Sequence, residues 1–411
     1  MNHFERSDYL PLLILFVSFD SIRSFCTYYY GFFPLTYILG AITVICVFLY
    51  KQWYFYPENY KIYRVVHIYL LWLFIGIIRG MLVAENSWEW RQLTVGSFAL
   101  ISPMFLYVFT NQYILQKTLR FWVRYALTAF IVIFLLIDKG SYHYYLGPVF
   151  LLGCFWPVLP KKWAIIMLVL LGTMLLVSFG DRSQVIKAAV TLLIGLGYLF
   201  SGFIKKPMLT IAHWTFYIAP VVFLYLGISG IFNPFEYMAK SADGKYVQEE
   251  TAVGQEDYAA DTRTFIYEEV ITSAVRHGYI WHGRTPARGN DSWTFGAYTA
   301  EEMKTGKYER HSNEVCHPNV FTWLGLIGAI LYSSFYLIGS YLALYKSNSL
   351  WMKFLGVYIA FRWLFGWIED ISEFDISSIS LWMMISMGFS ESIRSMDNEQ
   401  LQDWVLQIFK K

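Results

Sequence analysis

The stretch RHSNEVCHPNVFTWLGLIGAILY, residues 310–332, changes character at its middle. Up to His317 it is polar and titratable, and beyond that it is almost purely apolar, with Gly325 and Gly328 three residues apart. Such a change marks the point where a water-exposed connection enters a hydrophobic span. His311 and His317 therefore lie at the expected membrane surface, where a neutral imidazole can take a proton near pH 7. The alternative is that both histidines only form interfacial hydrogen bonds.

The composition extends this interpretation to the whole chain. Of its 411 residues, 56% are hydrophobic and 15% are charged, whereas a soluble domain is nearer a quarter charged. Apolar windows of about 18–22 residues, long enough to cross a bilayer, recur along nearly the whole length. We therefore expect an all-α polytopic membrane protein with about twelve spans, the first of them retained rather than cleaved, and no nucleic acid partner. The expected spans are residues 9–28, 33–50, 65–83, 92–110, 121–137, 143–160, 163–179, 186–203, 209–231, 318–345, 350–367 and 376–392.

The Lys and Arg residues of the short connections predict the orientation. They fall mainly in alternate connections, and this bias places both termini in the cytoplasm. The long connection after the ninth span then lies outside. The chain divides into nine spans over residues 1–231, an outer loop over 232–317, three spans over 318–393 and a cytoplasmic tail over 394–411.

The second part of the outer loop has the pattern of a helix. Asp261 or Thr262 suits the start of this helix, and Gly278 suits its end. The apolar residues at helical spacing are Ile266, Val270, Ile271, Ala274 and Val275.

The same part of the loop is rich in arginine, whose planar guanidinium grips phosphate with two hydrogen bonds. These residues are Arg263, Arg276, Arg284, Arg288 and Arg310. Because the loop carries more acidic than basic side chains, the alternative is that its arginines pair with its own carboxylates.

Arg182, in GDRSQVIKAAV (residues 180–190), lies at the expected outer start of a helix. The helix dipole opposes a cation there and favours an anion such as phosphate. An arginine at this position is therefore easier to explain if an anionic group joins it. The alternative is a simple Asp181–Arg182 pair at the interface.

Other ionisable residues fall inside or beside the spans. Asp20, Arg23 and Arg362 lie within expected spans, where such groups normally face each other or a polar cavity. The acidic run EDISEFD, residues 369–375, resembles a metal site in composition but is equally typical of an exposed outer loop.

Together these features resemble the O-antigen ligase and O-antigen polymerase superfamily of bacterial envelopes. HPNVFTWLGLIG, residues 317–328, is similar to that family's motif of a histidine followed through apolar residues by Gly-x-x-Gly. Here Pro318 follows the histidine and the spacer is shorter, so either His317 or His311 takes the family's role, and His317 is favoured. Gly325 and Gly328 match the two glycines.

Two more stretches carry the resemblance. Arg182 matches the arginine of the family's Ser-Arg-Gly-type helix start, with Asp181 and Ser183 as departures. Arg263 matches the arginine that begins the family's loop helix, and Gly283 and Gly289 are loose matches to the Gly-rich turn that ends it.

The resemblance implies an enzyme of the bacterial inner membrane that works on the periplasmic side. The donor would be a glycan on undecaprenyl diphosphate, and the acceptor a sugar hydroxyl on a second glycan or on lipid A-core. His317 or His311 would act on that hydroxyl, and Arg182, Arg263, Arg284 and Arg288 would bind the diphosphate. No cofactor or metal is expected, since the first outer connection, TYYYGFF (residues 27–33), lacks the carboxylate ligands of other lipid-linked glycosyltransferases.

The expected reaction is the polymerisation of O-antigen or capsular repeat units, with a chain-length regulator as a further partner. The first alternative is a ligase that transfers the finished glycan to lipid A-core, and both would bind membrane lipid. The remoter alternative is a transporter, in which Asp20, Arg23 and Arg362 would mark the path of an ion or substrate.

Overall fold

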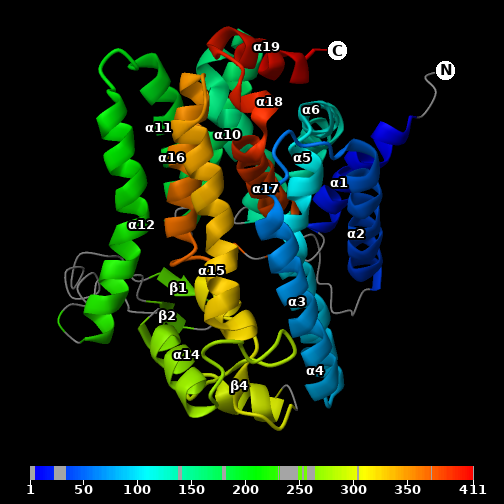
Figure 1. Ribbon diagram of the computed structural model, residues 1–411, viewed down its shortest axis with the longest axis vertical. Coiled ribbons are helices and arrows are strands. Elements are labelled where there is room, and N and C mark those ends of the chain that lie inside the picture. Colours follow the sequence, from blue (N-terminus) through cyan, green and yellow to red (C-terminus); the bar gives the residue numbers. More distant parts are fainter. Residues whose placement is uncertain are drawn as a thin grey trace.

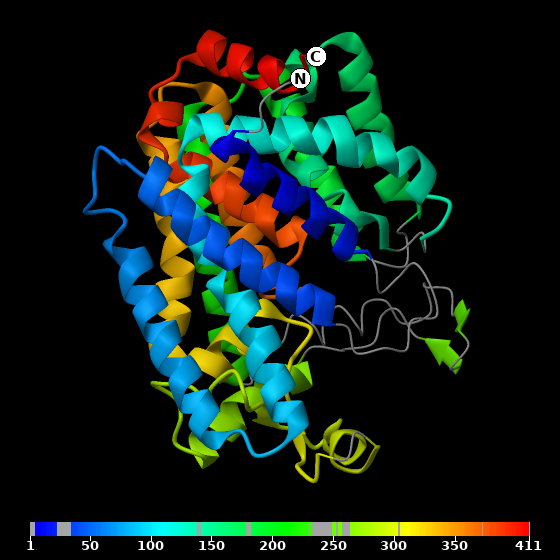
Figure 2. The ribbon, with the colours of Figure 1, turned by 90° about the vertical axis from the view of Figure 1, so that its right-hand side faces the viewer.

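The structure, a computed structural model, describes residues 5–22, 34–137, 141–177, 182–229, 231, 249–251, 254–256, 264–302, 305–371 and 373–410. It is 77% helical with almost no sheet, which confirms the expected all-α class. The bundle stands upright in Figure 1, and Figure 2 shows it from the side.

The elements follow one another as a series of helices with two short hairpins. The α-helices are α1 (Tyr9–Asp20), α2 (Pro34–Tyr54), α3 (Arg64–Val83), α4 (Ser87–Ile101), α5 (Leu106–Phe109), α6 (Gln112–Phe121), α7 (Leu127–Ile133), α8 (Tyr142–Tyr145), α9 (Gly147–Leu152), α10 (Lys161–Val177), α11 (Arg182–Leu199), α12 (Lys206–Ile228), α14 (Thr264–Arg276), α15 (Cys316–Tyr345), α16 (Leu350–Phe365), α17 (Ile376–Phe389), α18 (Glu391–Arg394) and α19 (Asn398–Ile408).

Shorter turns of other helix types and four strands complete the chain. The 3₁₀-helices are η1 (Arg6–Asp8), η3 (Ser102–Phe105) and η6 (Gly153–Val158), and the π-helices are η4 (Trp122–Ala126) and η7 (Tyr298–Glu302). The strands are β1 (Glu249–Thr251) with β2 (Gly254–Glu256), and β3 (Asn290–Asp291) with β4 (Glu309–Arg310), each pair antiparallel.

Five helices among the described residues are long and apolar enough to cross a membrane: Leu35–Tyr54, Arg64–Val83, Ser87–Phe109, Lys206–Ile228 and Cys316–Tyr345. Each of the twelve expected spans overlaps one or more helices, but several of those helices are short or interrupted. The membrane class is therefore supported. The number of spans and the placement of residues 232–317 outside the membrane stay predictions.

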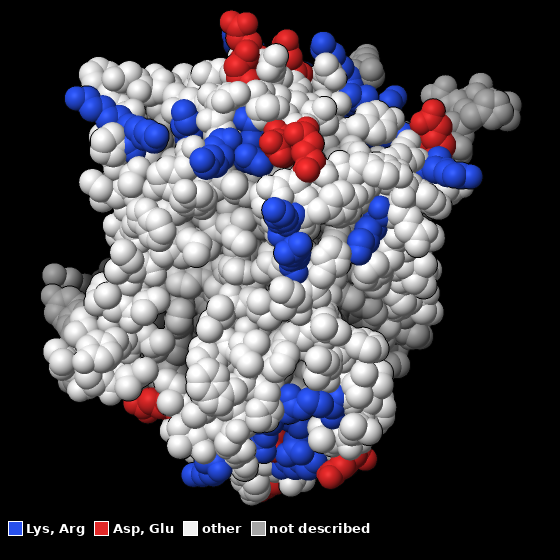
Figure 3. Space-filling model, viewed as in Figure 1, with Lys and Arg blue, Asp and Glu red and all other residues white. Residues whose placement is uncertain are grey.

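The core of the bundle is formed by α16 and α17. All but one residue of α17 is buried, and α17 lies in the middle of the bundle in both ribbon views. Around it, α2, α3 and α12 expose many large apolar side chains. Charged residues gather toward the two ends of the molecule and leave an uncharged band between them (Figure 3). An exposed apolar belt of this kind is the surface that a lipid-embedded protein presents.

The end of the bundle that carries both termini holds a helix pair that the sequence analysis did not anticipate. The stretch expected to be a tail contains α19, which packs against α6. Asp397 and Gln400 form a capping box at its start, and this arrangement satisfies the first free amides of the helix. Trp404 anchors it by donating from Nε1 to the carbonyl of Gln112 (3.3 Å).

The opposite end is capped by the part of the long loop that follows residue 263. It contains α14, the β3–β4 hairpin and η7, and it covers the lower ends of α3, α4 and α15 (Figure 1). The expected loop helix is confirmed: Ile266, Val270 and Ala274 are buried, although Val275 is exposed. Gly278, with φ +66°, follows the last turn as expected. The caps proposed at residues 261 and 262 lie outside the described residues.

The helix α15 is broken at Gly325, which has φ 70° and ψ −172°. The loop segment 279–285 fills the break. The carbonyls of Thr322 and Trp323 accept hydrogen bonds from the amides of Arg284 (2.7 Å) and Thr285 (3.1 Å). Backbone groups that a helix break leaves unpaired are thus satisfied by the loop, as the interior of a membrane protein requires.

The other side of the break is satisfied in the same way. The amides of Leu326 and Ile327 donate to the carbonyls of Ile280 (2.8 Å) and Trp281 (3.3 Å). Trp72 of α3 donates from Nε1 to the carbonyl of Leu324 (2.9 Å). Residues 326–345, enough for one crossing, therefore continue beyond the break, while the first part of α15 belongs structurally to the loop.

Gly283 and Gly325 meet backbone to backbone at the break. A methyl group on Gly325 would lie 2.4 Å from the Gly283 nitrogen, and one on Gly283 would lie 2.5 Å from the Gly325 nitrogen. Arg79 of α3 fixes the loop side by donating to the carbonyls of His282 (2.9 Å) and Gly283 (3.0 Å). The glycines that carried the family resemblance thus have a direct structural role.

We expect Gly325→Ala to lower the stability of the protein strongly. The backbone conformation alone costs about 1–3 kcal/mol for a residue with a side chain, and the clash with Gly283 adds to this. The measurement is the midpoint of thermal unfolding in detergent. Gly172→Ala is the matched control, because a methyl group there meets nothing within 4 Å. Equal midpoints for the two variants would contradict the role of the break.

Candidate functional site

The candidate site is centred on the turn that follows α16, residues 366–370. The start of α15 is attached to this turn by its main chain. The amide of Cys316 donates to the carbonyl of Glu369 (3.1 Å), and the amide of His317 donates to the carbonyl of Gly366 (3.2 Å). The first amides of a helix have no partner within the helix, so the turn supplies acceptors that α15 lacks.

The side chain of His317 is buried between two tryptophans. Its ring lies 5.2 Å from the ring of Trp363 and 4.7 Å from the ring of Trp367. Nε2 lies 2.9 Å from the carbonyl oxygen of Trp363. Because a carbonyl only accepts, Nε2 carries the proton and Nδ1 keeps the lone pair. No described residue forms a hydrogen bond with Nδ1.

The start of α11 reaches the same turn through Glu369. Ser183 donates from Oγ to Glu369 Oε1 (2.8 Å), and Gln184 donates from Nε2 to the same oxygen (3.0 Å). Lys187, one helical turn further, lies 2.8 Å from both carboxylate oxygens and is buried. Burial raises the pKa of Glu369, but Lys187 outweighs this effect and holds it below the usual range. Arg182 is the first residue of α11, and its side chain lies outside the described residues.

The first turn of the loop helix α14 also contacts this turn. The hydroxyl of Tyr267 donates to the carbonyl of Trp367 (2.5 Å), and the two rings stack. Arg263, four residues before Tyr267, lies outside the described residues. Three stretches that sequence analysis singled out separately, around Arg182, Arg263 and His317, are thus joined through their neighbours to one short turn.

A buried amide group extends the site toward the hairpin. Asn319 donates from Nδ2 to Asp370 Oδ2 (2.8 Å) and to the carbonyl of Asn313 (2.8 Å). Asn313 donates in turn to Asn290 Oδ1 (2.9 Å) on β3. These bonds hold the segment between the hairpin and α15 in a fixed path beside the turn.

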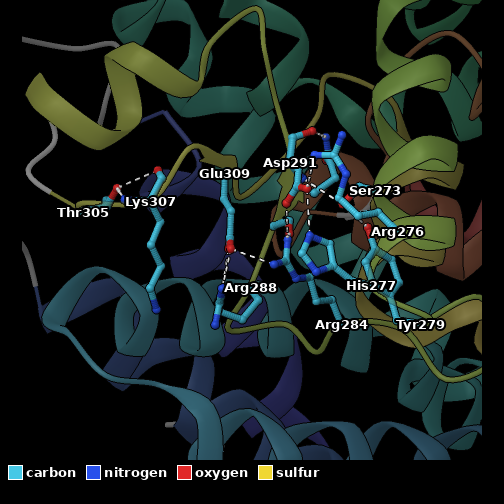
Figure 4. Close-up of polar contacts among 12 residues, drawn as sticks. Ser273, Arg276, His277, Tyr279, Arg284, Arg288, Asp291, Thr305, Lys307 and Glu309 are labelled. Atoms are coloured by element: carbon cyan, nitrogen blue, oxygen red, sulfur yellow. Dashed lines mark hydrogen bonds and ion pairs between the residues drawn. The ribbon is translucent and has the colours of Figure 1, made fainter.

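Arg284 and Arg288 are both engaged with carboxylates of the loop itself (Figure 4). Arg284 lies 2.9 Å from Asp291 Oδ1 and 2.9 Å from Glu309 Oε1. Arg288 donates from Nε to Glu309 Oε2 (2.8 Å), and this bond raises the pKa of its guanidinium. Burial raises the pKa of Asp291, but its bonds with His277 and Arg284 hold it below its usual range. The network thus balances its charges internally.

The same network ties the loop to α4. Lys307, which Figure 4 shows beside Glu309, lies 2.8 Å from Glu85 and 2.5 Å from Glu89. Glu89 is buried, and Arg288 Nε approaches it at 3.9 Å. Buried charges are tolerated only when they are paired, so these contacts fix where the loop sits on the bundle.

His311 lies beside this network rather than on the turn. Its side chain is buried, and Nδ1 has no hydrogen-bond partner among the described residues. Burial lowers the pKa of its imidazole below the usual range. Its backbone carbonyl accepts a hydrogen bond from Trp323 Nε1 (3.1 Å). The structure thus gives the two candidate histidines different surroundings.

Thr285 is the one described residue other than glycine with a positive φ, at 91°. A β-branched residue rarely adopts this conformation, which costs energy that the surroundings must supply. Here its amide bonds to the carbonyl of Trp323 in the break of α15. The strained residue Thr285 therefore lies next to Arg284, where segment 279–285 fills the break in α15.

Three carboxylates of the acidic run each have a partner of their own. Glu369 bonds Lys187, Asp370 bonds Asn319, and Asp375 caps α17 by accepting from the Ser378 amide (2.6 Å). Among the described residues, no group of three or more His, Cys, Asp or Glu side chains is placed to hold a metal ion.

The ionisable groups within the expected spans are only partly described. Arg362 is buried in α16, and its Nε has no described partner. Arg23 lies outside the described residues. Neither of the two cavities described below is lined by Asp20 or Arg362.

Lys187 and Glu369 were not identified from the sequence as members of one site. Ser183 and Lys187 are spaced by four and therefore share a face of α11. That spacing was the available signal. It could not reveal Glu369 as their partner, because that residue is 182 positions away from Lys187.

Comparisons of the chain with protein-family models, with curated proteins and with solved structures gave no match.

We expect Lys187→Met to destabilise the protein by roughly 3 kcal/mol, because it leaves the partly buried Glu369 carboxylate without the cation that pairs with it. Lys187→Met combined with Glu369→Gln should cost less than the sum of the two single changes. Thermal unfolding in detergent measures both effects. Lys161→Met, at an exposed lysine, is the control. The pairing is refuted if Lys187→Met behaves like that control.

We also expect His311 to make the protein less stable as the pH falls from about 7 to 5. The folded protein holds this imidazole neutral, with a lowered pKa, while the unfolded chain binds a proton with a pKa of about 6.5. Protonation therefore favours the unfolded chain. His311→Gln should flatten this part of the curve of unfolding midpoint against pH, and an unchanged slope would contradict the burial of a neutral ring.

Proposed function

We propose that the chain is a glycosyltransferase of the bacterial inner membrane. It moves a glycan from undecaprenyl diphosphate to a sugar hydroxyl at the periplasmic face, without a metal. The leading reaction within this proposal is the joining of O-antigen or capsular repeat units. Transfer of the finished glycan to lipid A-core is the alternative that the experiment below separates from it.

The observation that supports this proposal is the convergence on the turn at residues 366–370. The start of α15, the start of α11 and the first turns of α14 all form hydrogen bonds with it. The starts of α15 and α11 contain His317 and Arg182, and Arg263 directly precedes α14 in the sequence; these are the residues matched to the family's motifs. A transferase needs its base and its phosphate-binding groups at one place, whereas a transport path would favour the scattered charges within the spans.

The tautomer of His317 suits the acceptor side of the reaction. With the proton on Nε2, the lone pair of Nδ1 is the group that accepts the proton of the acceptor hydroxyl. The hydroxyl oxygen then forms its bond to the anomeric carbon of the donor sugar, and the bond from that carbon to the diphosphate oxygen breaks. Attack from the face opposite the leaving group inverts the anomeric configuration.

The diphosphate leaves with its negative charge and needs cations rather than a proton. In this proposal Arg182 and Arg263 supply them. Arg284 and Arg288 organise the loop instead, because Asp291 and Glu309 already occupy their guanidinium groups. This assigns the four candidate arginines to two different tasks.

We expect His317→Ala to lower the rate of glycan transfer in cells by on the order of 10²-fold or more. A positioned base contributes a factor of about 10²–10⁴ to such a rate. The test uses a strain of the source organism that lacks this protein, complemented with each variant, and compares surface polysaccharide on a gel. His282→Ala is the control, because this exposed histidine lies in the loop and only its backbone carbonyl is used, by Arg79.

The gel of the uncomplemented strain identifies the reaction. Core carrying a single repeat unit indicates a polymerase, and bare core with accumulated carrier-linked glycan indicates a ligase. Full-length glycan in the uncomplemented strain, or in the strain with stably produced His317→Ala, would refute the proposal.

Arginine variants should divide into two groups. Arg182→Ala and Arg263→Ala should lower transfer while leaving the unfolding midpoint close to that of the wild type. Arg284→Ala should lower the midpoint, because it removes one ion-pair partner from Asp291 and one from Glu309. The same complementation assay, with unfolding of the purified variants, measures both properties. If Arg182→Ala and Arg263→Ala retain full transfer, the proposed diphosphate site is wrong.

A further inference from the structure

A second candidate site lies at the end of the bundle that carries both termini, away from the 366–370 turn. A cavity of about 270 Å³ opens there between the chain segments 54–63, 110–113 and 389–394. Three candidate membrane spans, Leu35–Tyr54, Arg64–Val83 and Ser87–Phe109, begin or end at this level. The cavity therefore lies where the expected membrane meets water.

The walls of this cavity are fixed to one another by hydrogen bonds. Asn111 donates to the carbonyl of Tyr54 (3.2 Å), and Tyr63 donates to the carbonyl of Phe389 (3.3 Å). Ser390 donates from Oγ to the carbonyl of Thr110 (2.6 Å). The hollow is therefore part of the folded structure and does not depend on a single loose side chain.

Two polar groups of the wall lack the partners that buried groups normally have. Arg394 is 7% exposed, and it uses Nη1 to donate to the carbonyl of Lys346 (3.2 Å). Its Nε is buried and has no hydrogen-bond partner among the described residues, and neither does Gln112 Oε1. Both atoms are enclosed by the protein, so what a ligand in the cavity meets is the positive charge of the Arg394 guanidinium, whose side chain is part of the lining.

The charges of the wall select the kind of ligand. Glu58 and Glu391 line the cavity together with Arg394, so carboxylates outnumber the cation. A purely anionic group would be repelled by this wall. A zwitterion fits it, because its phosphate suits Arg394 and its ammonium suits the two carboxylates.

A second hollow, of about 480 Å³, shares Tyr56 with the first. Its lining combines the aromatic side chains of Phe48, Phe55, Tyr56 and Tyr60 with Lys51, Gln52 and His67. Phe48 is exposed on α2, within a candidate membrane span. A polar hollow at the membrane surface thus adjoins one whose aromatic side includes Phe48 on the expected lipid-facing surface and whose polar side includes Lys51. This is the amphipathic shape of a phospholipid.

We propose that the two hollows bind one phospholipid with a zwitterionic headgroup of the phosphoethanolamine type. The phosphate pairs with the guanidinium of Arg394, the ammonium group faces Glu58 and Glu391, and the adjoining chain lies along Phe48 and Phe55. This inference does not depend on the proposed glycan transfer.

The test is native mass spectrometry of the full-length protein in detergent. Phosphatidylethanolamine and phosphatidylglycerol with the same acyl chains are added separately at matched concentrations. We expect the wild type to retain phosphatidylethanolamine preferentially. Glu58→Gln with Glu391→Gln should remove this preference. Each exposed carboxylate lost should lower the retention of phosphatidylethanolamine by roughly 1.4- to fivefold. Glu399→Gln with Asp403→Asn, the same charge change on exposed residues of α19, should keep it.

Arg394→Gln is the second variant and should weaken the retention of both lipids, because both contain a phosphate. Equal retention of the two lipids by the wild type would overturn the proposal. So would a preference that persists after both carboxylates are removed. If excess soluble phosphoethanolamine is retained as well as the lipid, the site recognises a free metabolite and the lipid assignment is wrong.

Discussion

The filling of the break in α15 is the constraint on which the rest of the loop end depends. A helix that stops inside a bundle exposes carbonyl and amide groups that cost several kcal/mol each if they stay unpaired. Segment 279–285 supplies the missing partners on both sides of Gly325. The backbones of Gly283 and Gly325 are in contact. Segment 279–285 therefore fits at only one position along α15. Main-chain contacts therefore determine where the large loop lies on the bundle, and side-chain contacts add to them.

The charged side chains of the loop follow from this docking. A segment inserted among apolar helices cannot keep unpaired cations, so Arg284 and Arg288 share Glu309, and Lys307 reaches Glu89 of α4. Their charges are used within the fold. The same argument applies to Lys187 and Glu369 at the candidate site, where a buried cation holds a carboxylate ionised. Composition alone makes these side chains look alike, and only their partners separate structural from functional roles.

Much of the fold could be predicted from the sequence because hydropathy and periodicity are local properties. They identified the helical membrane class, the buried face of α14 and the role of Gly278 as its end. The break at Gly325 could not be predicted as a break, since its partners are backbone groups of a distant loop. The pair of Lys187 with Glu369 was equally inaccessible, because no periodicity connects α11 to the turn after α16. The helix α19 was missed because its short amphipathic pattern was counted with the tail.

The candidate site illustrates how a helix end can prepare a side chain for chemistry. The carbonyl of Trp363 lies in the last turn of α16, where it accepts from the amide of Gly366 (3.1 Å) and keeps a lone pair for a second donor. It accepts from the Nε2 of His317 (2.9 Å), while the carbonyl of Gly366 accepts from the backbone of the same histidine (3.2 Å). Both contacts orient the ring, and the first determines which nitrogen carries the proton. A carboxylate in place of that carbonyl would favour the charged imidazolium. Burial is what disfavours a charged ring here, and with the proton on Nε2 the lone pair of Nδ1 stays available.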